Sequence, residues 1–298
     1  MKKISFLITG AAACVSLLVS SCSKEYSNES GIVVDSTSTP AVAKTLLNQA
    51  YGTDSMQKAD IYLPANRTKD STKTLIILHG GYWFEGDKSD LDSAIIILQA
   101  LYPTLNIVNA NYRLANAANS STQFPAQMTD IQLLVSYLLN NRDSLKISAN
   151  IALAGVSAGG HLALEYAYKY DASKQIKVAG GIVPPVNFLD TYYTTSSYAS
   201  TFAQIALNFT GKPISDTTSY KLYSPYYNLS STSQPTFVAF GGLDPLVPPH
   251  SDTLFYNKLV ASNITYSYNF YGSEGHDFST TAIYDALTRF VAFLKANL

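Results

Sequence analysis

Two kinds of apolar pattern alternate along the chain from about Thr45 onward. Short continuous apolar runs are typical of buried strands, whereas longer stretches with apolar side chains at helical spacing are typical of amphipathic helices. The expected strands are 56–64, 73–78, 106–112, 150–153, 178–183, 236–240 and 264–270. The expected helices are 91–101, 125–139, a segment beginning near 162, 250–260 and 284–294. This alternation predicts the α/β class, with a mostly parallel sheet covered by helices on both faces.

Two parts of the domain depart from this regular alternation. The first expected strands, 56–64 and 73–78, have no helix between them, so we expect an antiparallel edge there. Residues 187–232 are polar with scattered aromatic side chains and show no clear period. We interpret them as a small insertion or lid at the carboxyl end of the sheet.

The first 44 residues also lack the alternation. Lys2 and Lys3 precede an apolar run over 4–19, which is typical of a signal peptide. The following Val19-Ser20-Ser21-Cys22 resembles a bacterial lipobox, which implies a lipid on Cys22 and attachment to a membrane, expected to be the outer membrane. The alternative is ordinary secretion with a free Cys22. The expected divisions are a signal peptide over 1–21, a flexible tether over 22–44 and one folded domain over 45–298.

Composition excludes several classes of protein. Hydrophobic residues make up 47% of the chain, which is enough for a sizeable core. A formal net charge of −1, without a block of basic residues, argues against a nucleic-acid partner. The sequence has two cysteines, and Cys14 lies in the expected signal peptide, so we expect neither a disulfide nor a thiolate metal site.

The strongest chemical signal is Gly155-Val156-Ser157-Ala158-Gly159, which lies between an expected strand and an expected helix. Strand, Gly-x-Ser-x-Gly and helix form the context of a nucleophile elbow, in which a tight turn presents the serine hydroxyl above the sheet. Side chains at Gly155 and Gly159 would collide in so tight a turn. The pattern therefore predicts Ser157 as a nucleophile.

A serine nucleophile needs a general base, and the chain has only four histidines. His161 follows Ser157 on its helix and is expected to point away from the hydroxyl. His250 starts a later helix and is expected at the surface, while His79 is expected to hold its glycine loop by a hydrogen bond. His276 lies in a loop between the last strand and the last helix, at the same sheet edge as Ser157. We therefore predict His276 as the base.

The base needs an acid to orient it, and Asp244 follows an expected strand between the serine and the histidine in chain order. Three other aspartates are weaker candidates: Asp190, Asp252 and Asp277. Asp277 is too near His276 in sequence to orient its ring easily, and we interpret it as a helix cap.

An oxyanion is usually held by backbone N–H groups. Ala158 follows the nucleophile and is predicted to supply one of them. The loop His79-Gly80-Gly81-Tyr82 follows an earlier strand and is predicted to supply the other, from Gly81 or Tyr82.

These motifs together resemble the α/β-hydrolase esterases, in the branch related to feruloyl and acetyl esterases and to hormone-sensitive-lipase-like carboxylesterases. The resemblance covers about residues 50–298 and rests on 79–83, 155–161, 241–247 and 275–276. It implies an α/β-hydrolase fold and a Ser157-His276-Asp244 triad, in that family's chain order Ser, Asp, His. It also implies ester hydrolysis through an acyl-enzyme, without a metal or organic cofactor. The segment 79–90 also resembles kynurenine formamidases of the same fold.

The substrate is less well defined by the sequence. Trp83 and Phe188 are aromatic and close to the expected site, so substrate contact and simple packing both stay open for them. The expected substrate is a small ester or an acylated carbohydrate, for example an acetylated or feruloylated polysaccharide. The alternatives are an arylformamidase or a peptidase of the same fold, and a catalytically inactive glycan-binding lipoprotein.

Overall fold

The computed structural model describes residues 40–298, so the expected signal peptide, Cys22 and most of the expected tether lie outside the described residues. Within 40–298 the strands form one eight-stranded sheet in the order β1-β2-β4-β3-β5-β6-β7-β8. The strands are β1 (Lys44–Ala50), β2 (Lys58–Leu63), β3 (Thr74–Leu78), β4 (Asn106–Ala110), β5 (Ile151–Val156), β6 (Ile176–Ile182), β7 (Thr236–Gly241) and β8 (Tyr266–Tyr271).

The pairing directions confirm the prediction of a mostly parallel sheet with an antiparallel edge. Strands β3 to β8 pair in parallel, whereas β2 is antiparallel to both β1 and β4. Strand β1 was not among the expected strands. Its residues are mostly exposed, because it lies at the sheet edge, so it carries no buried apolar run that would have indicated it.

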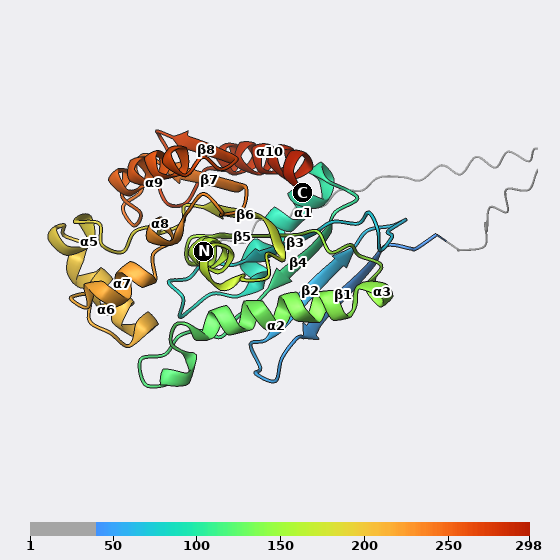
Figure 1. Ribbon diagram of the computed structural model, residues 1–298, viewed down its shortest axis with the longest axis horizontal. Helices are drawn as coiled ribbons and strands as arrows, with labels where there is room; N and C mark the ends of the chain where they lie inside the picture. Colours follow the sequence, from blue (N-terminus) through green and yellow to red (C-terminus); the bar gives the residue numbers. More distant parts are fainter. Residues whose placement is uncertain (1–39) are drawn as a thin grey trace, which may run out of the picture. The chain divides into compact units, whose positions relative to one another are not determined.

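Helices cover both faces of the sheet (Figure 1). The helices are α1 (Asp92–Leu101), α2 (Ala126–Asn140), α3 (Arg142–Leu145), α4 (Ala158–Glu165), α5 (Tyr192–Thr195), α6 (Ala199–Thr210), α7 (Thr217–Leu222), α8 (Pro225–Asn228), α9 (Pro249–Ser262) and α10 (Thr280–Asn297). Single-turn helices are η1 (Lys88–Leu91) and η2 (Ser120–Thr122), and a π-helical turn, η3 (Tyr166–Tyr170), continues α4. None of the helices in 40–298 combines the length and the apolar character that crossing a bilayer would need.

The core has two layers, one on each face of the sheet. Leu75 and Ile77 of β3 pack in the layer beneath α1 and α10, whereas Ile76 between them packs in the layer with α2, α4 and α9. Because successive strand residues point to opposite faces, a strand covered on both sides must be apolar throughout. This is why the central strands could be recognised as continuous apolar runs.

The segment 187–232 forms a group of short helices, α5 to α8, between β6 and β7 (Figure 1). It was expected to be an insertion, but its helices were not expected. Aromatic side chains of α6 are buried against the domain, among them Phe202 and Phe209. The Tyr192 and Tyr193 hydroxyls donate to the carbonyls of Pro245 and Leu246, at 2.8 and 3.1 Å. The insertion therefore packs on the loop that follows β7.

The loop over 79–90 is anchored to the sheet by a buried polar cluster. Lys88 Nζ lies 2.6 Å from Asp60 Oδ2 on β2, and both side chains are almost completely buried. The Lys88 N–H donates to the Asn111 side chain at 2.6 Å, and the Asn109 side chain donates to the Lys88 carbonyl at 2.7 Å. These bonds fix the end of a loop that begins at the tip of β3.

Replacing Lys88 by methionine is expected to lower the free energy of unfolding by about 3 kcal/mol, because it leaves the Asp60 carboxylate buried without its cation. Adding Asp60→Asn should recover part of the loss, because the remaining group is neutral. Urea denaturation of the wild type, both single variants and the double variant measures this coupling. If the losses of unfolding free energy in the two single variants simply add up in the double variant, the coupling between Lys88 and Asp60 is contradicted.

Candidate active site

Ser157 lies on a strained turn between β5 and α4. Its backbone angles are φ 52° and ψ −120°, a combination that non-glycine residues rarely adopt. The Ser157 N–H donates to the Ile182 carbonyl of β6 at 2.8 Å, which holds the turn at the carboxyl end of the sheet. The sequence context therefore has the strand–turn–helix geometry of a nucleophile elbow.

Two glycines permit this turn. A Cβ on Gly155 would lie 2.3 Å from the carbonyl carbon of Gly159. A Cβ on Gly159 would lie 2.3 Å from the Leu78 oxygen and 2.4 Å from the His79 oxygen. All three distances are far below van der Waals contact, so a side chain at either position would displace backbone. The structure thus confirms that side chains would collide at the elbow. For Gly159 the collision would be with the end of β3.

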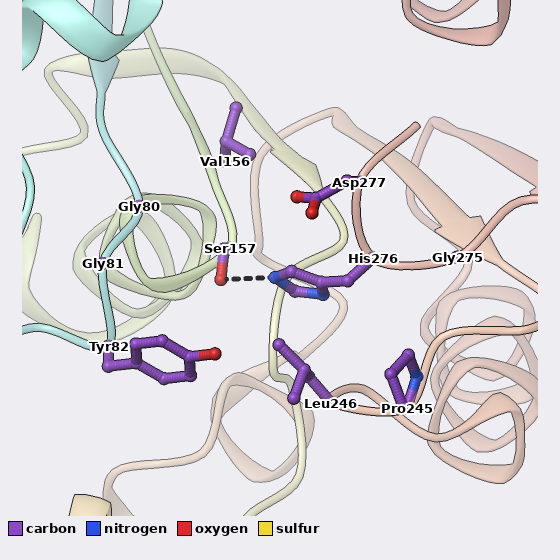
Figure 2. A pocket seen from close by; sticks show the side chains of 10 residues that line it. All are labelled: Gly80, Gly81, Tyr82, Val156, Ser157, Pro245, Leu246, Gly275, His276 and Asp277. Carbon is purple, nitrogen blue, oxygen red and sulfur yellow. Dashed lines mark hydrogen bonds between the residues drawn. The ribbon is translucent and has the colours of Figure 1, made fainter. Parts of the chain in front are cut away.

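A chain of hydrogen bonds joins the three residues predicted to act together, and Figure 2 shows its first bond, between Ser157 and His276. The Ser157 Oγ lies 2.9 Å from His276 Nε2, and His276 Nδ1 lies 2.8 Å from Asp244 Oδ2. Since a carboxylate only accepts, Nδ1 carries the proton in the neutral ring and Nε2 accepts from the serine hydroxyl. The Asp244 side chain is 1% exposed and that of His276 is 15% exposed. The base is therefore accessible from outside, while its acid partner is buried.

The buried Asp244 carboxylate is held by backbone groups. Its Oδ1 accepts from the N–H groups of Leu246 and Val247 at 2.7 and 2.9 Å. Hydrogen bonds of this kind fix the orientation of the carboxylate. The acid can therefore hold one tautomer of the His276 ring.

The other three candidate aspartates lie elsewhere. Asp190 accepts hydrogen bonds from His250 and Ser251, at 3.0 and 2.7 Å, and Asp252 is buried on α9. The interpretation of Asp277 as a helix cap is wrong, because Ser279 caps α10 through a bond from the Ala282 N–H. Asp277 is instead exposed beside His276 and lines the cleft (Figure 2).

The loop after β3 passes close to the nucleophile. A Cβ on Gly80 would lie 3.3 Å from the Ser157 Cβ, so only a residue without a large side chain fits there. Gly81 and Tyr82 have φ angles of 107° and 51°. Within residues 40–298, the N–H groups of Gly81, Tyr82 and Ala158 donate to no other protein group. Free N–H groups beside a serine hydroxyl are what an oxyanion site requires.

His79 has the structural role that the sequence indicated. Its buried ring donates from Nδ1 to the Gly80 carbonyl at 2.6 Å and stacks on Tyr112, with 4.5 Å between ring centroids. The Tyr112 hydroxyl in turn donates to the His79 carbonyl at 3.0 Å. Burial lowers the pKa of His79, which keeps the ring neutral.

His161 was expected to point away from Ser157, but its partners were not predicted. Its buried ring accepts from Trp83 Nε1 at Nδ1, at 3.1 Å, and donates from Nε2 to the Tyr223 carbonyl, at 2.8 Å. It therefore joins the loop after β3, the helix behind the nucleophile and the insertion. The only signal in the sequence was a histidine on a mostly apolar helix.

The two aromatic residues expected near substrate are buried in the core. Trp83 is 2% exposed and stacks on Phe209, with 4.4 Å between centroids. Phe188 is 1% exposed and meets Trp83 edge-on at 5.5 Å. Phe188 does not line the space beside Ser157, so of the two possibilities left open for it the structure favours packing. Trp83 lines a small cavity beside Ser157, on the side of the insertion.

An open cleft of about 570 Å³ lies over Ser157 and His276. Figure 2 shows the residues around it, which are Gly80, Gly81, Tyr82, Val156, Ser157, Pro245, Leu246, Gly275, His276 and Asp277. Residues 40–298 contain no group of three or more His, Cys, Asp or Glu side chains placed to hold a metal ion. The cleft therefore offers a nucleophile, a base and N–H donors to a bound carbonyl group.

Acid is expected to destabilise the fold through His161. Burial lowers its pKa to about 4 from an ordinary 6.5. As pH falls from 6.5 to 4, His161 binds a proton in the unfolded chain but stays neutral in the folded protein. About 3 kcal/mol of the free energy of unfolding is therefore lost. Glu165 acts in the opposite direction over part of this range, because burial raises its pKa to about 7.

The difference in free energy of unfolding between wild type and His161→Gln therefore isolates the contribution of the histidine. Urea denaturation between pH 7 and pH 4 should show the stability advantage of the wild type shrinking with falling pH. A pH-independent difference between the two proteins would contradict a neutral buried His161.

Comparison with known proteins identifies the family. The BD-FAE family model matches residues 59–259. A kynurenine formamidase of Salmo salar is 28% identical over 158 residues, which are 51% of this chain and 50% of that protein. An arylacetamide deacetylase of Bos taurus is 30% identical over 139 residues, 44% of this chain and 34% of that protein. The chain thus spans half or less of the length of these curated relatives.

Solved structures share the fold over most of the described domain. One is a truncated carbohydrate esterase from gut microbiota, with a TM-score of 0.68, 20% identity, and coverage of 88% of this chain and 99% of that one. Another is an esterase from Pyrobaculum calidifontis, with a TM-score of 0.66, 21% identity, and coverage of 86% and 85%. These likenesses confirm the predicted α/β-hydrolase fold. Since the family model covers more than half of the sequence, the chain belongs to the BD-FAE family of α/β-hydrolase-type esterases.

Proposed function

We propose that the protein hydrolyses carboxylic esters through an acyl-enzyme formed on Ser157. The observation that carries this proposal is the hydrogen-bond chain from Ser157 through His276 to the buried Asp244, on a strained elbow that faces an open cleft. A serine hydroxyl is a weak nucleophile until a neighbouring base accepts its proton.

In the first half of the reaction, His276 Nε2 takes the Ser157 proton and Oγ attacks the ester carbonyl. The oxygen of the tetrahedral intermediate accepts from the Ala158 N–H and from that of Gly81 or Tyr82. Asp244 stabilises the imidazolium and keeps it in the productive orientation. The imidazolium then protonates the departing alkoxide.

In the second half, His276 takes a proton from water, and the resulting hydroxide attacks the acyl group on Ser157. Collapse of this intermediate returns the proton to Ser157 and releases a carboxylic acid. These steps use only side chains, backbone amides and water.

An acylated carbohydrate is the substrate class that we propose for this reaction. The cleft is open and partly polar, which suits a large hydroxylated alcohol better than a buried apolar chain. A similar fold is found in a carbohydrate esterase from gut microbiota. Export as a lipoprotein attached through Cys22 would bring the enzyme to extracellular polysaccharide, and metabolic labelling with palmitate, lost in Cys22→Ser, tests that attachment.

Kynurenine formamidase activity is a second candidate, supported by relatives at 28% identity. Formylkynurenine carries an amino-acid carboxylate. Its α-ammonium can pair with Asp277, but within residues 40–298 no Lys or Arg lines the cleft to pair with that carboxylate. We therefore favour a neutral leaving group.

Ser157→Ala is expected to lower kcat for p-nitrophenyl acetate by about 10⁴-fold or more, because no other hydroxyl can form the acyl-enzyme. Asp244→Asn should lower kcat by about 10³–10⁴-fold, because it no longer holds the required tautomer. Ser173→Ala, in an exposed turn, is the matched control and should keep full activity.

The same proteins should be compared on acetylated xylan, methyl ferulate and N-formylkynurenine, and tested for labelling by a fluorophosphonate. Preference for N-formylkynurenine would move the assignment to the formamidase. Absence of turnover and of labelling in wild type would exclude both hydrolases and favour a glycan-binding protein.

A further inference from the structure

Two spaces of very different size meet at Ser157 and His276. One is the open cleft of about 570 Å³. The other is a cavity of about 20 Å³ on the side of the insertion, which has room for about one water molecule or methyl group. An ester bound at Ser157 has an acyl arm and an alkoxy arm, one on each side of its carbonyl carbon. The two arms must therefore occupy spaces of unequal size.

The wall of the small cavity is largely apolar, and the insertion supplies part of it. Tyr193, Tyr198, Phe202 and Ile205 contribute to it, together with Trp83 of the loop after β3. Apolar surface outweighs polar surface in this wall, so it suits a small hydrocarbon group.

Packing keeps this wall in place. Tyr193 stacks on Phe202 with 3.9 Å between ring centroids, and its hydroxyl donates to the Leu246 carbonyl. Phe202 also contacts Phe188, and Trp83 is held by its bond to His161. Enlarging the cavity would require several buried rings to move together, which close-packed interiors resist.

The position of the proton donor decides which arm lies where. The departing alkoxide takes its proton from His276, and the neighbours of His276, Gly275 and Asp277, line the cleft but not the cavity. The alkoxy arm therefore lies in the open cleft, and the acyl arm lies in the cavity.

We propose that this enzyme transfers only acyl groups of one or two carbons, formyl or acetyl, from bulky alcohols, and that Phe202 and Ile205 of α6 set this limit. The inference rests on the proposed ester hydrolysis. In the reaction, the bond between the acetyl carbon and Ser157 Oγ forms, and the bond to the alkoxy oxygen breaks. The alkoxide receives the proton from His276, and water then releases acetate. A feruloyl group on the acyl side does not fit.

The test uses p-nitrophenyl acetate, butyrate and hexanoate, which share one leaving group, together with methyl ferulate. For wild type, each added methylene should lower kcat/KM by about tenfold or more, and methyl ferulate should not be hydrolysed. Ile205→Ala should raise the ratio of butyrate to acetate kcat/KM by about fivefold or more, because it enlarges the cavity. Ile205→Val should shift that ratio in the same direction by less.

Leu207→Ala on the same helix is the matched control, because Leu207 is 37% exposed and lines neither space. It should leave the ratio unchanged. Since the ratio compares two substrates on one protein sample, partial unfolding of a variant does not alter it.

The outcomes separate this inference from the proposed function. Equal rates on acetate and hexanoate, or faster hydrolysis of methyl ferulate than of acetate esters, would overturn the acyl limit while leaving ester hydrolysis intact. A ratio that Leu207→Ala shifts as much as Ile205→Ala would overturn the assignment of Ile205. Absence of turnover on every ester would refute the proposed function and this inference with it.

Discussion

The close contact between the end of β3 and the start of α4 is the constraint on which the rest of the site depends. The Gly159 Cα lies against the carbonyls of Leu78 and His79, with no space for even a methyl group. This contact brings the loop after β3 next to the turn that carries Ser157. The N–H groups of two separate segments can therefore face one bound oxygen only because a glycine lies between them.

The rest of the domain holds these two segments in place from behind. The Asp60–Lys88 pair fixes the far end of the loop, and the neutral His161 ties Trp83 to α4 and to the insertion. Both devices are buried polar contacts, which are costly unless every partner is present. Rigid placement of this kind is what makes donors effective toward a developing charge, since they need not reorganise during the reaction.

Local sequence patterns were sufficient for the parts of the site that local geometry dictates. The elbow, the order of Ser157, Asp244 and His276, and the glycine loop each follow from short motifs, and the structure brings those residues together. The central strands were recognisable because burial on both faces requires continuous apolar runs. Strand β1 was not, because an exposed edge imposes no such requirement.

Contacts between distant segments could not be predicted in this way. Whether Phe188 meets substrate or core depends on where α6 and α7 pack, and no periodicity in 187–232 indicates that. The same holds for His161, whose partners lie 78 and 62 residues away in the chain. Trp83 and Phe188 thus proved to be buried packing residues around the site.

The burial of Trp83 has a spectroscopic consequence. It is the only tryptophan in the sequence, and its indole N–H donates to His161 while its ring stacks on Phe209. All indole fluorescence of the protein therefore originates within the aromatic cluster that joins the loop after β3 to the insertion. The emission maximum and its quenching by acrylamide report on that junction alone, so the molecule carries its own optical probe close to Ser157.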